Sequence, residues 1–312
     1  MTWWRAGAGS NNLAARSEFR NRLEAAIARS LLLSLERTPR AFSEAMGIFY
    51  ARLLDAAIPR YRRIAERNLT LAYPEATPVW RTRIIDGVFE SIGRMLSVFA
   101  RFPQITSANV SDWIRYDGFE HYEAALRQGR GVLFATAHLG NWELSAFAHA
   151  LLAKPMHVVV RPLDNPILDG LVEQRRALSG NNLLSKRDFA RAILQGLRKN
   201  QAVGILVDQN TAPEHGVFVP FFGRAACANT TFAKLAARSG AAVIPGFAVW
   251  NRTERRYVLR FYPAVPMTGE EAEDTARIQA AVEAAVREYP DQWLWIHRRW
   301  KTRPAGEPPL YN

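Results

Sequence analysis

The chain has 312 residues, of which 41 are Lys or Arg and 29 are Asp or Glu, giving a formal net charge of +12, and 48% of its residues are hydrophobic. This composition excludes a disordered or fibrous chain, and the length allows a core that needs neither disulfides nor metals. The single cysteine, Cys227, excludes an internal disulfide and is typical of a reducing cytoplasm. The positive charge favours an anionic partner: nucleic acid, a phosphorylated metabolite or an anionic lipid surface.

The first third of the chain, residues 1–105, is predicted to be helical, because apolar residues recur there at helical spacing. The stripes are Leu23, Ile27, Leu31 and Leu35; then Phe42, Met46, Phe49, Tyr50, Leu53 and Ala57, between Pro39 and Pro59; then Ile84, Val88, Ile92, Met95 and Val98. A basic cluster follows the second stripe: Arg60, Arg62, Arg63 and Arg67. Two interpretations stay open. The stripes pack a core, or they form an interfacial layer in which Trp3, Trp4 and the arginines lie on anionic headgroups.

Beyond about residue 117, short apolar runs alternate with amphipathic segments. Strands are predicted at 131–137, 156–160, 202–207, 242–249 and 257–262, and helices at 142–153, 166–178, 188–197, 230–239 and 270–289. The Gly-, Pro- and Phe-rich stretch between 207 and 230 is predicted to be a loop. This alternation is typical of an α/β fold with a mostly parallel central sheet flanked by helices. We expect one domain over residues 1–312, with a helical membrane-associating layer (1–105) and an α/β catalytic core (106–312).

The segment from Thr136 to Glu143 carries the most chemical information. His138 lies where a buried strand ends and a helix begins, the edge at which parallel sheets bind ligands. Gly140 allows a tight turn, Asn141 is suited to cap the helix, and Glu143 falls in its first turn. A carboxylate near a histidine can orient it as a general base for a hydroxyl group. The alternative is that Glu143 only complements the helix dipole and His138 only fills a loop.

Other common catalytic signatures are missing from the sequence. It contains no GxGxxG, GxxxxGK[ST], GxSxG or HExxH motif. The six histidines show no metal-ligand spacing, so we expect no metal site. The longest charge-free runs, 131–142 and 239–251, are shorter than the roughly 18 residues that span a bilayer, and no secretory signal is recognisable, so we expect no membrane-spanning helix.

Several blocks, in order, resemble the late (secondary) lauroyl- and myristoyl-type acyltransferases of bacterial lipid A biosynthesis, within the glycerolipid acyltransferases that share an H-x4-D/E motif. The resembling blocks are HLGNWE (138–143), VVRP (159–162) with Asn165-Pro166, VDQ (207–209), VFVPFFG (217–223), NTT (229–231) and GAAVIP (240–245). The resemblance covers about residues 20–300 and implies a glycerolipid acyltransferase-like fold.

The resemblance also implies roles for individual residues. His138 is expected to be the general base and Glu143 its orienting partner, and Arg161 to hold a phosphate or the developing oxyanion. Further substrate-binding residues are expected at Asn141, Asp208, Gln209 and Arg224. Contacts with the acyl chain or the membrane are expected at Phe218, Phe221 and Phe222.

The implied activity is O-acyl transfer from a thioester, with acyl carrier protein as the expected donor and acyl-CoA as the alternative, to a hydroxyl of an anionic lipid A-type glycolipid. No acyl-enzyme and no cofactor are expected. A phosphoinositol mannoside, a lysophospholipid or another bacterial lipid is the alternative acceptor. A basic nucleic-acid-binding protein is a remote alternative, disfavoured because no recognition motif is present.

The implied location is the cytoplasmic face of the bacterial inner membrane. Family members commonly begin with an apolar anchor helix, but here residues 25–35 are interrupted by Arg29 and bounded by Glu36. We therefore expect peripheral or monotopic attachment. A second basic–aromatic cluster of the kind found at membrane interfaces is predicted near the C-terminus: Trp295, Arg298, Arg299, Trp300, Lys301 and Arg303.

Overall fold

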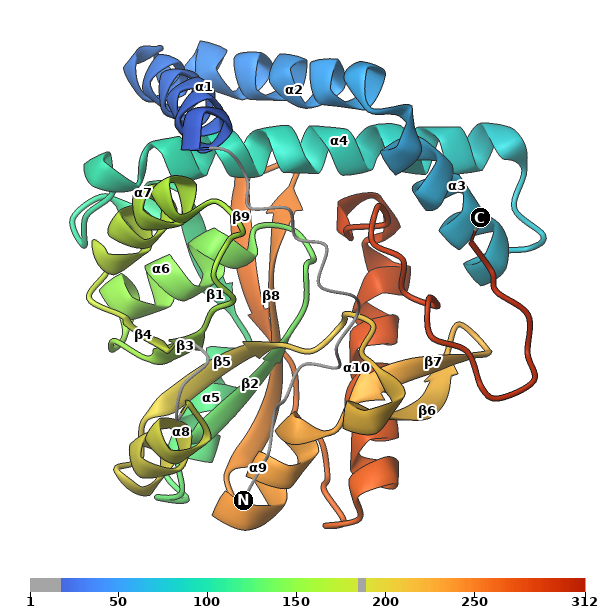
Figure 1. Ribbon diagram of the computed structural model, residues 1–312. Coiled ribbons are helices and arrows are strands. Elements are labelled where there is room, and N and C mark those ends of the chain that lie inside the picture. The colour runs from blue at the N-terminus through green and yellow to red at the C-terminus, as the bar shows by residue number, and fades with distance from the viewer. Residues whose placement is uncertain (1–17, 185–188, 312) are drawn as a thin grey trace.

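The computed structural model describes residues 18–184 and 189–311, and Figure 1 shows the arrangement of their elements. Trp3 and Trp4 of the expected interfacial layer, and Asp188 at the expected start of a helix, lie outside the described residues.

A seven-stranded sheet forms the centre of the molecule. The strands of the structure are β1 (Ile114–Asp117), β2 (Val132–Thr136), β3 (His157–Val159), β4 (Asn182–Leu184), β5 (Ala202–Leu206), β6 (Gly216–Phe221), β7 (Arg224–Asn229), β8 (Ala242–Asn251) and β9 (Arg256–Phe261). The sheet order is β1-β9-β8-β2-β5-β3-β4, and every neighbouring pair is parallel except β8 and β9. The expected mostly parallel sheet is confirmed. The edge strands β1 and β4 were not predicted.

Helices cover both faces of this sheet. Those of the structure are α1 (Glu18–Arg37), α2 (Arg40–Ala57), α3 (Pro59–Ala72), α4 (Pro78–Ala100), α5 (Phe119–Leu126), α6 (Trp142–Leu152), α7 (Pro166–Ala177), α8 (Phe189–Arg198), α9 (Thr231–Ser239) and α10 (Glu271–Glu288). Along β2, Phe134 packs with Phe147 of α6, whereas Leu133 packs in the cluster that contains Ile193 of α8 and Phe232 of α9. Alternate residues of one strand therefore enter two different cores, which explains why β2 is a continuous apolar run.

A β-hairpin replaces the loop that was expected between 207 and 230. β6 and β7 pair antiparallel and are joined by Phe222 and Gly223, which both have positive φ (51° and 69°). Two such central residues are the requirement of a tight type I′ hairpin turn. The hairpin directs Phe221, fully buried, and Phe222 into a hydrophobic cluster with Trp293 and Trp295.

The three N-terminal apolar stripes differ in what covers them. The stripe of α4 is core, because Ile84, Val88 and Val98 are buried. On α1 and α2, however, exposed large apolar side chains form much of the surface: Phe19, Leu23, Ile27, Leu31, Phe42, Phe49, Leu53 and Leu54. Figure 1 shows α1, α2 and α4 along one side of the molecule, with α4 between α2 and the sheet. No helix within the described ranges has the length and apolar character needed to cross a membrane.

The tryptophan-rich C-terminal segment is buried, which corrects the expectation of a basic–aromatic surface there. Trp293, Trp295 and Trp300 are at most 1% exposed, and so is Arg299. The guanidinium group of Arg299 donates to the carbonyl of Cys227 and to Gln279 Oε1, both at 2.9 Å. The indoles pack against the hairpin and the N-terminal helices, so the segment joins separate parts of the fold.

One buried amide of α3 holds this segment in place. Asn68, fully buried, donates from Nδ2 to the carbonyls of Trp295 and His297 at 2.6 and 2.7 Å, and its Oδ1 accepts from the Tyr311 hydroxyl.

Asn68→Ala leaves several buried polar groups without partners, at about 1–3 kcal/mol each. We expect the free energy of unfolding, measured by urea denaturation, to fall by about 2–4 kcal/mol. A control, Gln195→Ala on the exposed side of α8, should change it little; an Asn68→Ala loss as small as the control's would contradict the role assigned to this amide.

Candidate active site

The sheet register brings two titratable side chains together. β2 and β5 are parallel, with Thr136 opposite Leu206 at the last pair of the ladder. His138 and Asp208 each lie two residues beyond these partners, so both side chains sit at the carboxyl edge of the sheet. The sequence placed both residues at strand ends; the register makes them neighbours.

Asp208 is the carboxylate that binds His138. Its Oδ1 lies 2.8 Å from His138 Nδ1, and its Oδ2 accepts from the backbone N–H of His138 at 2.9 Å and from Trp293 Nε1 at 2.8 Å. The Asp208 side chain is 3% exposed and that of His138 is 15% exposed. A carboxylate that only accepts at Nδ1 places the proton of the neutral ring there and leaves Nε2 as the basic nitrogen. Gln209 Nε2 lies 3.4 Å from that nitrogen.

The pair shifts the titration of both groups. Burial of the ring opposes protonation of His138, but the charge and hydrogen bond of Asp208, with a further contribution from Glu143, hold its pKa above the ordinary 6.5. Burial by itself would raise the pKa of Asp208, yet the charge of His138 and hydrogen bonds from His138 and Trp293 lower it to about 2. Asp208 is therefore a carboxylate at neutral pH, ready to stabilise a protonated His138.

Glu143 has a different partner from the one expected. Its two carboxylate oxygens accept from Arg176 of α7, at 2.8 Å from Nε and 2.5 Å from the terminal nitrogen. The geometry gives the orienting contact with His138 to Asp208, because Glu143, in the first turn of α6, is paired with Arg176 of α7. Glu143 and Arg176 nevertheless line the same cavity as His138.

The turn between His138 and α6 is shaped by two residues that were assigned these roles from sequence. Gly140 has φ of +65°, and a Cβ there would lie 2.0 Å from the carbonyl oxygen of Ala248. Asn141 caps α6, accepting from the Leu144 N–H at 2.9 Å, and is fully buried. Asn141 does not line the cavity. The contact that the structure shows for its side chain is the cap of α6.

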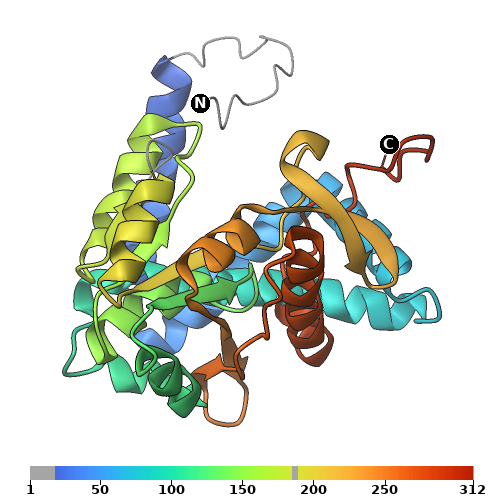
Figure 2. The ribbon, with the colours of Figure 1, turned by 90° about the horizontal axis from the view of Figure 1, so that it is seen from below.

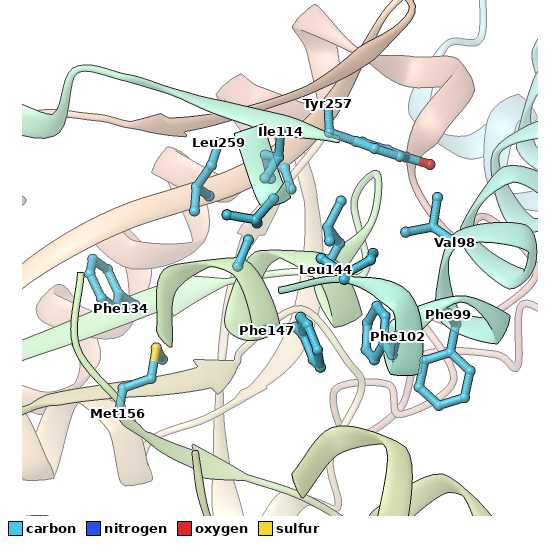
Figure 3. Packing of buried hydrophobic residues seen from close by; sticks show 14 of the residues in the cluster. Val98, Phe99, Phe102, Ile114, Phe134, Leu144, Phe147, Met156, Tyr257 and Leu259 are labelled. Atoms are coloured by element: carbon cyan, nitrogen blue, oxygen red, sulfur yellow. The ribbon is translucent and has the colours of Figure 1, made fainter. Parts of the chain in front are cut away.

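A cavity of about 480 Å³ lies next to His138, between α6 and the sheet. Its outer part is polar and is lined by His138, Glu143, Arg161 and Gln209. Its inner part is lined mainly by apolar side chains, which include Phe102, Phe134, Phe147, Met156, Val158, Leu183, Leu206, Leu259 and Phe261. In Figure 3, Phe134 lies near Met156, and Phe147 lies against Phe102. The cavity can hold an elongated apolar group with its polar end at His138.

Four residues that the sequence assigned to substrate, acyl-chain or membrane contact lie outside the cavity. Arg224, on β7, donates to the carbonyl of Leu71, and Phe221 and Phe222 are core residues of the C-terminal cluster. Phe218 is 38% exposed on the hairpin. None of the four lines the cavity, because the hairpin carries them to the other side of the catalytic edge.

Two residues of the site were missed from sequence. Trp293, to which the sequence assigned no role, donates to Asp208 from 85 positions away along the chain. Arg176, on the polar end of α7, binds Glu143. No local pattern marks either residue, because both contacts depend on how distant elements pack. Among residues 18–184 and 189–311, no group of three His, Cys, Asp or Glu side chains is arranged to hold a metal ion.

The chain is similar in sequence to one family of known proteins. The profile described as bacterial lipid A biosynthesis acyltransferase matches residues 20–302. The chain is 31% identical to the lipid A biosynthesis lauroyltransferase of Escherichia coli K12 over 271 residues, covering 85% of this chain and 87% of that protein. It is 30% identical to the palmitoleoyltransferase of the same organism (81% and 83% covered) and 26% identical to its myristoyltransferase (84% and 80% covered).

The assignment of Asp208 as the main partner can be tested by NMR titration of the His138 ring. In Asp208→Asn the pKa of His138 should fall, because the opposite charge that favours the protonated ring is removed. In Glu143→Gln it should fall less, since Glu143 acts only through its charge and is already paired with Arg176. A fall in Glu143→Gln as large as in Asp208→Asn would contradict the assignment.

Proposed function

This chain belongs to the bacterial lipid A biosynthesis acyltransferases and is an O-acyltransferase, and on that premise we propose that it transfers a fatty acyl chain from an acyl thioester to a hydroxyl group of a lipid A-type glycolipid. The observation that carries the proposal is that a histidine held by a buried carboxylate lies on the wall of a cavity lined mainly by apolar side chains. An acyl chain in the inner cavity presents its thioester carbonyl to His138.

His138 acts as the general base. Its Nε2 accepts the proton of the acceptor hydroxyl while that oxygen attacks the thioester carbonyl, and Asp208 stabilises the imidazolium that forms. The tetrahedral intermediate then breaks the C–S bond, and His138 returns the proton to the departing thiolate. The products are the ester and the free thiol, with no covalent acyl-enzyme. No step of this mechanism calls for a cofactor.

Arg161 and Gln209 are proposed to contact the polar parts of the substrates. Both are exposed residues on the cavity wall next to His138. A guanidinium group there can bind a phosphate of the acceptor or the oxyanion of the intermediate. Arg176, by contrast, lies in the same cavity with its charge compensated by Glu143, which leaves Arg161 as the more available cation.

The donor is proposed to be acyl carrier protein. Carrier proteins are acidic, and the net charge of +12 favours their encounter. Acyl-CoA, with its phosphates, is the alternative donor, and a phosphoinositol mannoside or a lysophospholipid is the alternative acceptor. The alternative donors and acceptors differ in the polar group that they present to Arg161. The role of His138 is the same for each of them.

The membrane is proposed to lie against α1 and the start of α7, on the cytoplasmic face of the inner membrane. Asn165, which caps α7, donates to the carbonyl of Asn21 and to Glu24 of α1, so the two helices are held together, as Figure 2 also shows. Exposed apolar side chains gather on them: Phe19, Leu23, Ile27, Leu163 and Ile167. Leu163 also lines the cavity, so this apolar surface is continuous with the cavity entrance. Attachment of this kind is peripheral or monotopic.

The catalytic proposal is tested with purified protein, a labelled acyl-carrier-protein or acyl-CoA donor and a panel of lipid acceptors. We expect His138→Ala to lower the transfer rate at least about 100-fold, the contribution of a positioned general base, while thermal unfolding stays close to wild type. Asp208→Asn should lower it by a similar factor, because the ring loses its tautomer and its counter-charge.

His121→Ala on α5, outside the cavity, is the matched control and should retain full activity. In the wild type the rate should rise with pH through the raised pKa of His138, since only the neutral ring accepts a proton. Near wild-type turnover in a folded His138→Ala protein would overturn the mechanism, and transfer to none of the acceptors would overturn the activity proposed.

The membrane surface is tested by co-sedimentation with vesicles that contain phosphatidylglycerol. The pair Leu23→Asp with Ile27→Asp should weaken partitioning at least tenfold, because each buried apolar side chain contributes about 1.5 kcal/mol or more. The matched control carries the same charge change and spacing on α10, at the exposed Ala280 and Ala284, and should lose far less. Equal loss in both proteins would show a charge effect only and contradict the assigned surface.

A further inference from the structure

The floor of the cavity has a gap in one row of side chains. In the register of the parallel sheet, Phe134 of β2 and Val158 of β3 both lie opposite Gly204 of β5. Residues opposite one another on neighbouring strands face the same side of a sheet. All three line the cavity, so the row facing α6 reads Val158, Gly204, Phe134, with no side chain at its centre.

Met156 reaches into this gap. A Cβ placed on Gly204 would lie 2.5 Å from Met156 Cε, so the end of the methionine side chain takes the volume that any larger residue at 204 would need. The backbone of Met156 is held on both sides: its N–H donates to Asn181 Oδ1 and its carbonyl accepts from the Asn182 N–H, both at 2.9 Å. The backbone is therefore fixed, and only the thioether end can move.

The aromatic residues around it are held by other rings. Phe102 and Phe147 are stacked with centroids 4.0 Å apart. The ring centroid of Phe134 lies 5.3 Å from that of Tyr122 and 5.5 Å from that of Phe261. Met156, 4% exposed, is unbranched and has three rotatable bonds, which makes methionine the side chain that best adapts to an irregular apolar space.

We infer that Met156, lying over Gly204, closes the inner end of the cavity and sets the longest acyl chain that the protein accepts. The inference rests on the proposed function, because it takes the cavity to hold the acyl group of the donor. Gly204 leaves room for the Met156 methyl group to withdraw from the chain, and a side chain at 204 would push that group into the space which the chain occupies.

Substitutions at Met156 and Gly204 should shift the preferred acyl-chain length in opposite directions. Met156→Ala removes the end wall and should shift the preferred donor to a longer chain; Gly204→Ala displaces Met156 Cε into the cavity and should shift it to a shorter one. The double variant should return toward wild type, since the displaced group is gone. The measurement is a competition among saturated acyl-carrier-protein thioesters of increasing length, with products quantified by mass spectrometry. We expect the long-to-short product ratio to change about tenfold in each single variant, the discrimination typical of a methylene in an apolar pocket.

Met95→Ala on α4, outside the cavity, is the matched methionine truncation and should leave the ratio unchanged. If Gly204→Ala does not fold, Met156→Phe replaces it as the variant that fills the cavity and should favour shorter chains. An unchanged ratio in folded Met156→Ala and in the filling variant, with transfer still measurable, would overturn the inference and leave the proposed function standing. If the wild type transfers no acyl group from any donor, the proposed function itself is overturned.

Discussion

The structure depends on one buried negative charge. Asp208 lies in the interior, where an unpaired carboxylate is costly, and it is stabilised by three donors: the ring and the backbone N–H of His138, and the indole of Trp293. Different parts of the fold position His138 and Trp293 beside Asp208. His138 comes from the register of β2 with β5, and Trp293 from the C-terminal segment, which in turn is held by Asn68 of α3. The geometry of the candidate site therefore depends on how the C-terminal segment packs against α3.

Polar and apolar side chains occupy separate parts of the region around His138. The edge of the sheet beyond β2 and β5 holds the titratable groups, while the face under α6 is lined by Phe134, Phe147 and Met156. On the opposite face, α8 and α9 pack tightly and belong to a separate hydrophobic cluster. On the α6 face the packing leaves the cavity of about 480 Å³ beside His138, so the two faces of one parallel sheet differ in how they are covered.

Several differences between expectation and structure share a physical cause. Glu143 was expected at His138 because only four residues lie between them. Its carboxylate instead pairs with Arg176 of α7, and Asp208 binds the His138 ring. Phe221 was expected to contact the acyl chain or the membrane, and Trp300 to lie in a basic–aromatic cluster at a membrane interface, yet both are buried in one cluster. The apolar stripe of α4 lies in the core, whereas those of α1 and α2 include exposed side chains, although periodicity describes all three equally well. Periodicity identifies a face of a helix and not what covers that face.

By itself the sequence determined the α/β class, the mostly parallel sheet, the turn at Gly140 with its cap at Asn141, and the place of His138 at a strand end. These properties are local: they follow from side-chain periods of two and 3.6 residues and from the backbone freedom of glycine. Only the tertiary structure decided that Asp208 orients His138, that Trp293 completes the site, that the hairpin carries Arg224 away from it, and that Met156 lies over Gly204. Those contacts join residues that are tens of positions apart, and strand register and helix packing, which no local pattern encodes, bring them within bonding distance.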